Sequence, residues 1–259
     1  MSRRPSTFNS RASEANEPFL LSCNPSFLLY AEQDFLEPWK AAILQTIIIN
    51  SQKGGSGKTM LSAHLATQAE RESEGPAYII DTDPQGTLTK WHSLRAAETP
   101  QRVEPPLTAI AQTLNRLRAR QASYCFVDTA PSREADVLSL LKLADLVIVP
   151  VQPSPSDIWS AAATFQLLKA ETIPFLFVMM RTKTNASITA QSVALLSKYG
   201  EVAATFVADR TAYAAAMTDG RTAQELTANG PAAHEMAALW KNVKAAIPPY
   251  TQQKEHAHG

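Results

Sequence analysis

The sequence predicts an α/β protein with a doubly wound, mostly parallel β-sheet covered by helices on both faces. Short β-branched and apolar runs alternate with longer segments of helical periodicity over most of the 259 residues, as in consecutive βαβ units. The short runs are apolar along their whole length, which is typical of strands buried on both faces. Right-handed crossovers then give a doubly wound sheet, in which ligands bind beyond the carboxyl ends of the strands.

The first half of the main domain contains three expected strands. Residues 46–50 ("TIIIN") are β-branched and apolar. A helix is expected over 58–71, because Leu61, Leu65 and Ala69 fall on one face. The elements expected next are a strand over 77–81, a helix beginning near Leu88, a loop or short strand over 97–107, a helix over 109–120 and a strand over 123–128.

The second half continues the alternation. Asp157 is expected to be the N-cap of a helix over 157–170, and Gly230-Pro231 favours the start of a closing helix. Trp159 and Trp240 are expected to be packing anchors. The elements expected are a helix over 134–143, a strand over 145–150, the helix over 157–170, a strand over 174–180, a helix over 188–199, a short strand over 202–207 and a helix over 231–246.

Both ends of the chain are expected to lie outside this domain. Residues 1–45 are predicted to be an N-terminal extension, because the first 17 residues are rich in Ser, Asn, Glu, Arg and Pro and are expected to be disordered. The rest of the extension carries apolar anchors and is expected to pack on the domain or on a partner. Residues 46–247 form the predicted domain, and residues 248–259 the predicted flexible tail.

The bulk composition restricts the class of protein. The 24 basic and 24 acidic residues give a formal net charge of zero, so any nucleic-acid contact must use a local patch. Cys23 and Cys125 form no CxxC pair, and Cys125 is expected to be a buried thiol in a reducing, cytoplasmic compartment. No apolar run approaches the roughly 20 residues that span a bilayer, and no membrane partner is expected.

A glycine-rich turn follows the first strand and reads "SQKGGSGKT" over 51–59. A strand that enters a helix through such a turn is an anion site, because backbone N–H groups and the helix dipole face the ligand. Lys58 can reach the β- and γ-phosphates of a nucleotide, and the Thr59 hydroxyl can take one position on Mg²⁺. The residues predicted to hold the nucleotide here are Gly54, Gly55, Ser56, Gly57, Lys58, Thr59 and Met60.

Polar turns follow several other expected strands and converge on the same edge of the sheet. Asp128 is predicted to hold Mg²⁺ through water, and Asp83 to orient the attacking water. The alternatives are a tight βα connection without a ligand and an Asp128 that only caps a helix or a strand.

Three motifs, "KGGSGKT", "DTDPQG" and "FVDTAPS", resemble those of the deviant Walker A ATPases, the ParA/MinD superfamily of P-loop NTPases. Gln52 stands where an ordinary phosphate loop has its first glycine, and this agrees with the family pattern. Ala130 replaces the proline that is usual in the third motif. The segments "VIVPVQPSPSDIWSAAATFQLLK" and "MMRTKTN" further resemble short ParF-like plasmid-partition proteins, so that the resemblance covers about residues 46–245.

The resemblance implies roles for particular residues. Lys53 corresponds to the signature lysine, which enters the partner's site when two subunits sandwich two ATP molecules. Lys53, Lys58 and Asp83 would then be the catalytic residues of a weak ATP hydrolase, with ATP/ADP and Mg²⁺ as cofactors. The remaining implied contacts are Ser154, Pro155 and Asp157 at the dimer seam, Asp128 in the Walker B role, and Arg181 and Thr182 beside the adenine.

Within the superfamily, the sequence favours a short ParA-type protein. Its end has no amphipathic membrane helix, Cys125 lies where no cluster forms, and 45 residues are too few for a helix-turn-helix domain. Such a protein is expected to segregate plasmid or chromosomal DNA with a ParB-like adaptor, associated with the nucleoid. The alternative is a positioning ATPase for a protein assembly of the secretion, conjugation or microcompartment type.

Non-specific DNA binding is implied by the same resemblance. The candidate residues are Lys198, Arg210, Arg221, Lys241 and Lys244. The same region also carries five acidic side chains, Glu201, Asp209, Asp219, Glu225 and Glu235. A solvated face of mixed charge is therefore the alternative.

Overall fold

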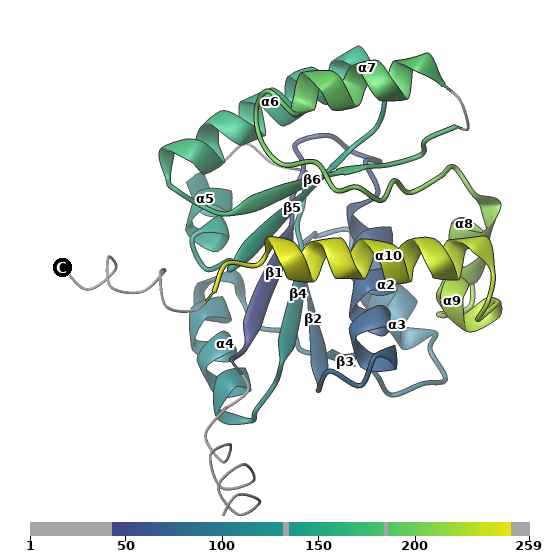
Figure 1. Cartoon of the computed structure of the whole chain (residues 1–259). Helices are drawn as coiled ribbons and strands as arrows, with labels where there is room; N and C mark the ends of the chain where they lie inside the picture. The colour runs from purple at the N-terminus through teal and green to yellow at the C-terminus, as the bar shows by residue number, and fades with distance from the viewer. Residues whose placement is uncertain (1–42, 132–134, 184–185, 250–259) are drawn as a thin grey trace, which may run out of the picture. The chain divides into compact units, whose positions relative to one another are not determined.

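A six-stranded, wholly parallel sheet lies between two layers of helices (Figure 1). The computed structural model describes residues 43–131, 135–183 and 186–249. The strands are β1 (Gln45–Ile49), β2 (Ala77–Asp81), β3 (Gln101–Arg102), β4 (Tyr124–Asp128), β5 (Leu146–Val151) and β6 (Phe175–Met179), in the order β3-β2-β4-β1-β5-β6. The predicted fold class is confirmed. The expectations for the first 42 residues and for the tail after residue 249 lie outside the described ranges.

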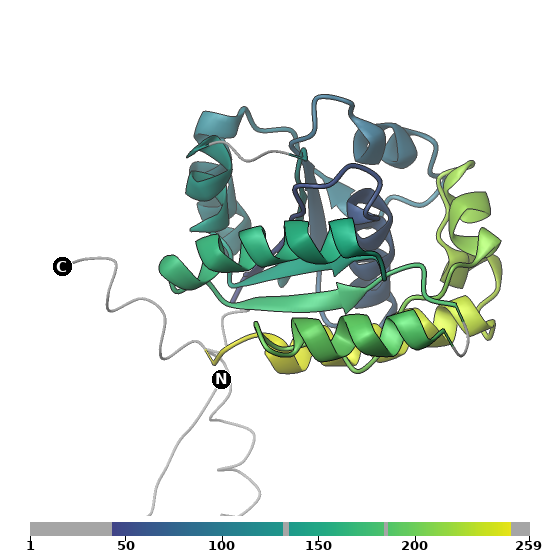
Figure 2. The same ribbon diagram turned by 90° about the horizontal axis from the view of Figure 1, so that it is seen from above.

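The helices fall into two groups, one on each face of the sheet. On one face lie α2 (Lys58–Arg71), α3 (Thr87–Ser93), α8 (Thr211–Met217), α9 (Ala223–Leu226) and α10 (Pro231–Ala246). On the other lie the 3₁₀ turn η2 (Leu107–Ala109), α4 (Ile110–Ala119), α5 (Ala135–Leu141), α6 (Pro155–Ala170) and α7 (Ser187–Leu196). Figure 2 shows α4 and α5 across the sheet from α8 and α9.

Each strand buries both of its faces, which explains its continuous apolar sequence. In β1, Ile47 and Ile49 join the core under α2 and α10, whereas Ile48 joins the core under α4–α7. All three are fully buried, and each contributes roughly 1.5–3 kcal/mol of hydrophobic burial. Cys125 in β4 is also buried, as expected, and this burial raises the pKa of its thiol to about 12.

The chain reverses its direction of winding around β1. The strands β4 and β5 both pair with β1, so that the first half of the chain builds outward on one side and the second half on the other. A doubly wound sheet has its binding crevice at such a switch point. The glycine-rich turn follows β1 and therefore lies at the crevice.

The strand expected over 202–207 is not present. Isolated bridges join Phe177 to Val202 and Thr182 to Ala208, with no continuous ladder between them. Between the bridges, the backbone N–H of Thr205 donates to Asn242 Oδ1 on α10 (2.9 Å). The segment therefore turns toward α10 and cannot continue as a strand. The helices α8 and α9, which follow it, were not expected.

Two further expectations were wrong in the α6 region. The N-cap of α6 is Ser154, whose Oγ accepts the backbone N–H of Asp157 (3.3 Å), so Asp157 lies inside the first turn. Trp240 is fully buried as a packing anchor, but Trp159 is 72% exposed.

A buried histidine joins α2 to the C-terminal helices. His64 Nδ1 lies 2.8 Å from the carbonyl of Met60, and its Nε2 accepts the backbone N–H of Ala223 (3.0 Å). This geometry assigns the neutral tautomer with the proton on Nδ1. Burial lowers the pKa of His64 to about 4. A proton on Nε2 would point toward the backbone N–H of Ala223, and the two donors would repel each other.

His64 is expected to make stability depend on pH. Because its folded-state pKa lies below the ordinary 6.5, the unfolded chain binds the proton more tightly, and stability falls as the pH drops from about 6.5 toward 4. Burial raises the pKa of Asp128 to about 7, which acts in the opposite direction. We therefore expect the stability advantage of the protein over His64→Gln to shrink by about 1 kcal/mol between pH 7 and pH 5.5. Urea unfolding of both proteins at the two pH values measures this, and an unchanged advantage would contradict it.

Candidate functional site

The turn between β1 and α2 forms an open, glycine-rich cradle, with nothing within 4 Å of a Cβ built on Gly54 or Gly55. Gly55 and Gly57 have φ values of 72° and 103°, a region that favours glycine. A Cβ on Gly57 would also lie 2.8 Å from Met180 Cε. Gly57 gives α2 no side-chain cap, which leaves the helix N-terminus open to an anion.

Lys58 lies under this cradle and is 6% exposed. Its Nζ donates to the carbonyls of Ser51 and Lys53, each at 3.3 Å, which is long for a charged donor. Burial lowers the pKa of Lys58, while the charges of Asp128 and Asp83 raise it. The ammonium is therefore desolvated and weakly bonded, a state in which an incoming phosphate gains the most.

Thr59 and Asp128 meet at the carboxyl ends of β1 and β4. Thr59 Oγ1 donates to Asp128 Oδ2 at 2.6 Å, and Asp128 Oδ1 is buried without a hydrogen-bond partner. Desolvation raises the pKa of Asp128 to about 7. Mg²⁺ takes oxygen ligands, keeps several waters and favours the ionised carboxylate. The unpaired carboxylate oxygen beside a hydroxyl fits such an ion, which Thr59 and Asp128 would hold.

Asp83 lies in the turn after β2. Its Oδ1 accepts the backbone N–H of Gln85 (2.9 Å), and its own N–H donates to Asp81 Oδ1 (3.1 Å). Asp81 Oδ2 accepts the N–H of Thr89 in α3 (2.8 Å). The Asp83 carboxylate is half-buried, and its electrostatic effect on Lys58 places it near the same site.

Lys53 points away from the loop that contains it. Its Nζ donates to Ser156 Oγ (2.9 Å) and forms an ion pair with Asp157 Oδ2 at the start of α6. The Asp157 side chain is 2% exposed and also accepts a hydrogen bond from Ser154 Oγ. The predicted seam residues therefore gather around Lys53, with Pro155 exposed beside them.

One residue of the site was not predicted. Gln152 Nε2 donates to the carbonyl of Gly55 (2.8 Å) and holds the phosphate loop against the end of β5. A glutamine in a loop carries no sequence signal for such a contact, since the two residues are 97 positions apart.

Arg181 and Thr182, which were predicted to lie beside the adenine, follow the end of β6. The two side chains differ in their exposure to solvent. Thr182 is buried, and its backbone N–H and carbonyl pair with Val207 and Asp209 (3.1 and 3.0 Å). Arg181 is exposed, with a φ of 50°. Met60, also predicted to bind nucleotide, is half-buried and packs against the core. The segment at 207–209 thus joins Thr182 at this edge of the sheet.

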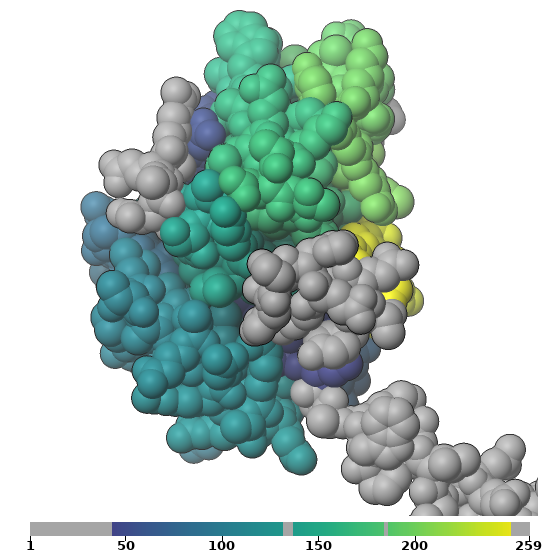
Figure 3. Space-filling model, turned by 90° about the vertical axis from the view of Figure 1, so that its left-hand side faces the viewer, coloured from purple at the N-terminus to yellow at the C-terminus, as the bar shows by residue number. Residues whose placement is uncertain are grey.

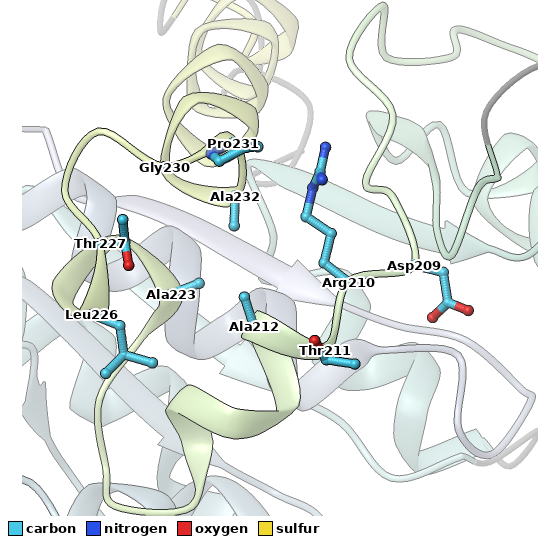
Figure 4. Close-up of a pocket in the computed structure, with 10 residues that line it drawn as sticks. All are labelled: Asp209, Arg210, Thr211, Ala212, Ala223, Leu226, Thr227, Gly230, Pro231 and Ala232. Carbon is cyan, nitrogen blue, oxygen red and sulfur yellow. The ribbon is translucent and has the colours of Figure 1, made fainter.

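Three of the five DNA candidates are held in ion pairs. Arg210 pairs with Glu235 (2.5 Å), Arg221 with Asp219 (2.5 Å), and Lys244 with Glu72 (3.0 Å) and Glu74. Figure 4 shows the Arg210 side chain beside Pro231 and Ala232, on a cavity of about 430 Å³. The other two candidates, Lys198 and Lys241, are exposed and have no ion pair among the residues that the structure describes.

Among the described ranges, no helix combines the length and the apolar character needed to span a bilayer.

Comparisons with known proteins agree with this geometry. A family profile described as the CobQ/CobB/MinD/ParA nucleotide binding domain matches residues 47–227. Maintenance of carboxysome distribution protein A from Halothiobacillus neapolitanus is 27% identical over 197 residues, covering 73% of this chain and 90% of that protein. The chromosome-partitioning ATPase Soj from Thermus thermophilus is 27% identical over 244 residues, covering 80% of this chain and 98% of Soj.

A solved structure shows the same fold. The MinD cell division protein from Aquifex aeolicus superposes with a TM-score of 0.65 at 18% identity, covering 79% of this chain and 98% of MinD.

Proposed function

Since the chain belongs to the CobQ/CobB/MinD/ParA nucleotide-binding family, we propose that it is a ParA-type ATPase that partitions or positions a cargo. It binds ATP with Mg²⁺, forms a nucleotide-sandwich homodimer and hydrolyses ATP slowly until an adaptor stimulates it. The cradle after β1 supports nucleotide binding, and the Thr59–Asp128 pair supports a metal held by one hydroxyl and one carboxylate.

The observation that carries this proposal is the separation of the two lysines. Lys58 is buried under the cradle and serves the phosphates of its own subunit. Lys53 is turned outward to α6 and is 38% exposed. A lysine that faces away from its own cradle is placed to neutralise charge on a second nucleotide, as an arginine finger does in trans.

Each residue then has a distinct part in hydrolysis. Lys58 and the amides of the cradle bind the phosphates and favour the charge that develops on them. Asp83 orients the attacking water, and the shape of its turn fixes where the carboxylate lies. Mg²⁺ held by Thr59 and Asp128 would neutralise charge on the phosphates.

Replacement of Asp83 by alanine is expected to reduce ATP turnover by at least about 100-fold while ATP affinity stays within about threefold. The ATP-bound dimer should therefore accumulate. Phosphate release and equilibrium binding of a fluorescent ATP analogue measure the two effects. The matched control is Asp83→Asn, which keeps an oxygen for the N–H of Gln85 but lacks the charge. Parental turnover in Asp83→Asn would contradict the water-orienting role.

A direct test of the proposed function is the size of the particle in solution. The chain of 28.2 kDa is expected to be a monomer without nucleotide and a dimer with ATP and Mg²⁺. Light scattering after gel filtration, with a non-hydrolysable analogue as a second sample, distinguishes the two. A monomer under all these conditions would overturn the sandwich dimer.

The cargo has two candidate classes. Segregation of plasmid or chromosomal DNA through a ParB-like adaptor, in a nucleoid-associated cytoplasmic protein, is supported by the similarity to Soj. Positioning of a protein assembly is supported by the similarity to the carboxysome distribution protein. ATP-dependent retention on non-specific DNA distinguishes them, because the first class requires it in this chain.

A further inference from the structure

A run of basic residues with no acidic residue among them in the sequence lies on α4, outside the C-terminal region that contains the predicted DNA candidates. From Pro105 to Val127 the chain carries Arg116, Arg118 and Arg120 and no aspartate or glutamate. We call these three side chains the arginine row. In a chain whose net charge is zero, they add three positive charges to 23 consecutive residues.

The arginine row is free to meet a ligand. Arg116 and Arg120 are exposed, and Arg118 is half-buried, donating to Asn115 Oδ1 (2.7 Å). None of the three forms an ion pair within the described part of the chain. By contrast, Arg210, Arg221 and Lys244 each have a carboxylate partner.

The helix arranges two of the three arginines in line. Arg116 follows Gln112 by one i, i+4 step, and Arg120, the C-cap of α4, follows Arg116 by another, with a rise of about 6 Å per step, whereas Arg118 lies off this line. The opposite side, with Leu114 and Leu117, is buried in the core. Figure 3 shows the segment that contains α4 on the outer surface of the molecule.

The position of the arginine row separates it from the nucleotide. Arg120 is the C-cap of α4 and lies four positions before Tyr124, the first residue of β4, and therefore near the amino ends of the strands. The phosphate cradle lies at the carboxyl end of β1, which is parallel to β4. A ligand on the arginine row can therefore be bound at the same time as ATP.

We propose that the arginine row binds the phosphate backbone of duplex DNA, an inference that rests on the DNA-partition form of the proposed function. Guanidinium groups bind phosphate oxygens through two parallel hydrogen bonds, and Asn115 and Gln112 add neutral donors. The exposed side of the helix carries Ala, Gln, Asn and Arg, with no aromatic ring that could stack on a base. The contact would hold the backbone without reading the sequence.

An acidic protein is the less suitable ligand for this surface. Protein interfaces are built around an apolar or aromatic centre, which the arginine row lacks. The apolar surface nearest along the helix is a cavity of about 440 Å³ around Leu107 and Leu143, at the other end of α4. Its lining reaches Ala111, about 7.5 Å from Arg116 along the helix axis, and includes none of the three arginines.

The test measures retention of the full chain, with ATP analogue and Mg²⁺, on a random-sequence duplex at several salt concentrations. Arg116→Gln combined with Arg120→Gln is expected to weaken binding at least about tenfold at low salt. It should also reduce the slope of log K against log salt by about two for each bound protomer. The matched control is Lys90→Gln combined with Lys169→Gln, which removes two exposed charges that form no ion pair in the described ranges and belong to no proposed site, and it should change binding less than twofold.

Three outcomes would overturn the inference in different ways. If the unaltered protein binds DNA and the α4 variant binds equally well, the arginine row is not the DNA surface, while the DNA-partition function stands. If the unaltered protein is not retained at any salt concentration, DNA binding itself fails. If poly-glutamate of equal charge displaces the duplex as efficiently as competing DNA, the surface does not prefer phosphate.

Discussion

Replacement of Lys58 by alanine is expected to abolish ATP binding and leave the fold intact. The loss should exceed about 100-fold in affinity, because a charged donor to phosphate is removed from a desolvated site. The unliganded protein should keep its stability to within roughly 2 kcal/mol. The Lys58 ammonium is buried and makes only two long hydrogen bonds to carbonyls, so its removal also ends a desolvation cost.

Thermal unfolding with and without ATP–Mg²⁺ measures both parts of this prediction. A ligand at 1,000 times its Kd stabilises the native state by roughly 4 kcal/mol, which gives a clear rise in Tm. Lys58→Ala should show no rise, and its Tm without ligand should be close to that of the unaltered protein. Lys53→Ala is the control within the same loop and should keep the rise. A parental rise in Lys58→Ala would exclude the assigned phosphate contact.

The local parts of the fold and site could be predicted because their signals lie within a few residues. The three isoleucines of β1 indicate a strand buried on both faces, and the glycines before Lys58 indicate a left-handed turn. The convergence of Asp83 and Asp128 followed from the parallel sheet alone. These predictions depend on the periodicity of apolar residues, the spacing of motifs and the order of strands and helices, and all three can be read along the sequence.

The other parts depend on contacts between distant segments. Lys53 and Asp157 are 104 residues apart, and nothing near either residue indicates their ion pair. The DNA candidates were chosen by charge, but Glu72 and Glu74 neutralise Lys244 from a segment about 170 residues away. The helices α8 and α9 have only 7 and 4 residues, too short for a clear period.

Replacement of Lys53 by alanine is expected to separate ATP binding from dimerisation. ATP affinity should remain within about threefold, because Lys53 is absent from its own cradle and bonds to Ser156 and Asp157. The ATP-dependent dimer and the turnover that needs it should both be lost, since an arginine-finger-like charge accelerates hydrolysis by about 10³-fold or more. Sedimentation with ATP–Mg²⁺ measures dimerisation, and phosphate release measures turnover.

The Lys53→Ala variant needs a control for stability, because Lys53 forms an ion pair with the buried Asp157. Asp157 is buried, and its Oδ1 has no hydrogen-bond partner, so removal of Lys53 leaves the Asp157 carboxylate without a counter-charge and with only the hydrogen bond from Ser154 Oγ. Lys53→Ala combined with Asp157→Asn removes the carboxylate charge and should recover stability, but it should not recover the dimer. Asp157→Asn alone should weaken the hold on Lys53 and allow dimerisation at a several-fold lower protein concentration. If Lys53→Ala still dimerised with ATP and hydrolysed it at the parental rate, the second lysine would have no role in trans.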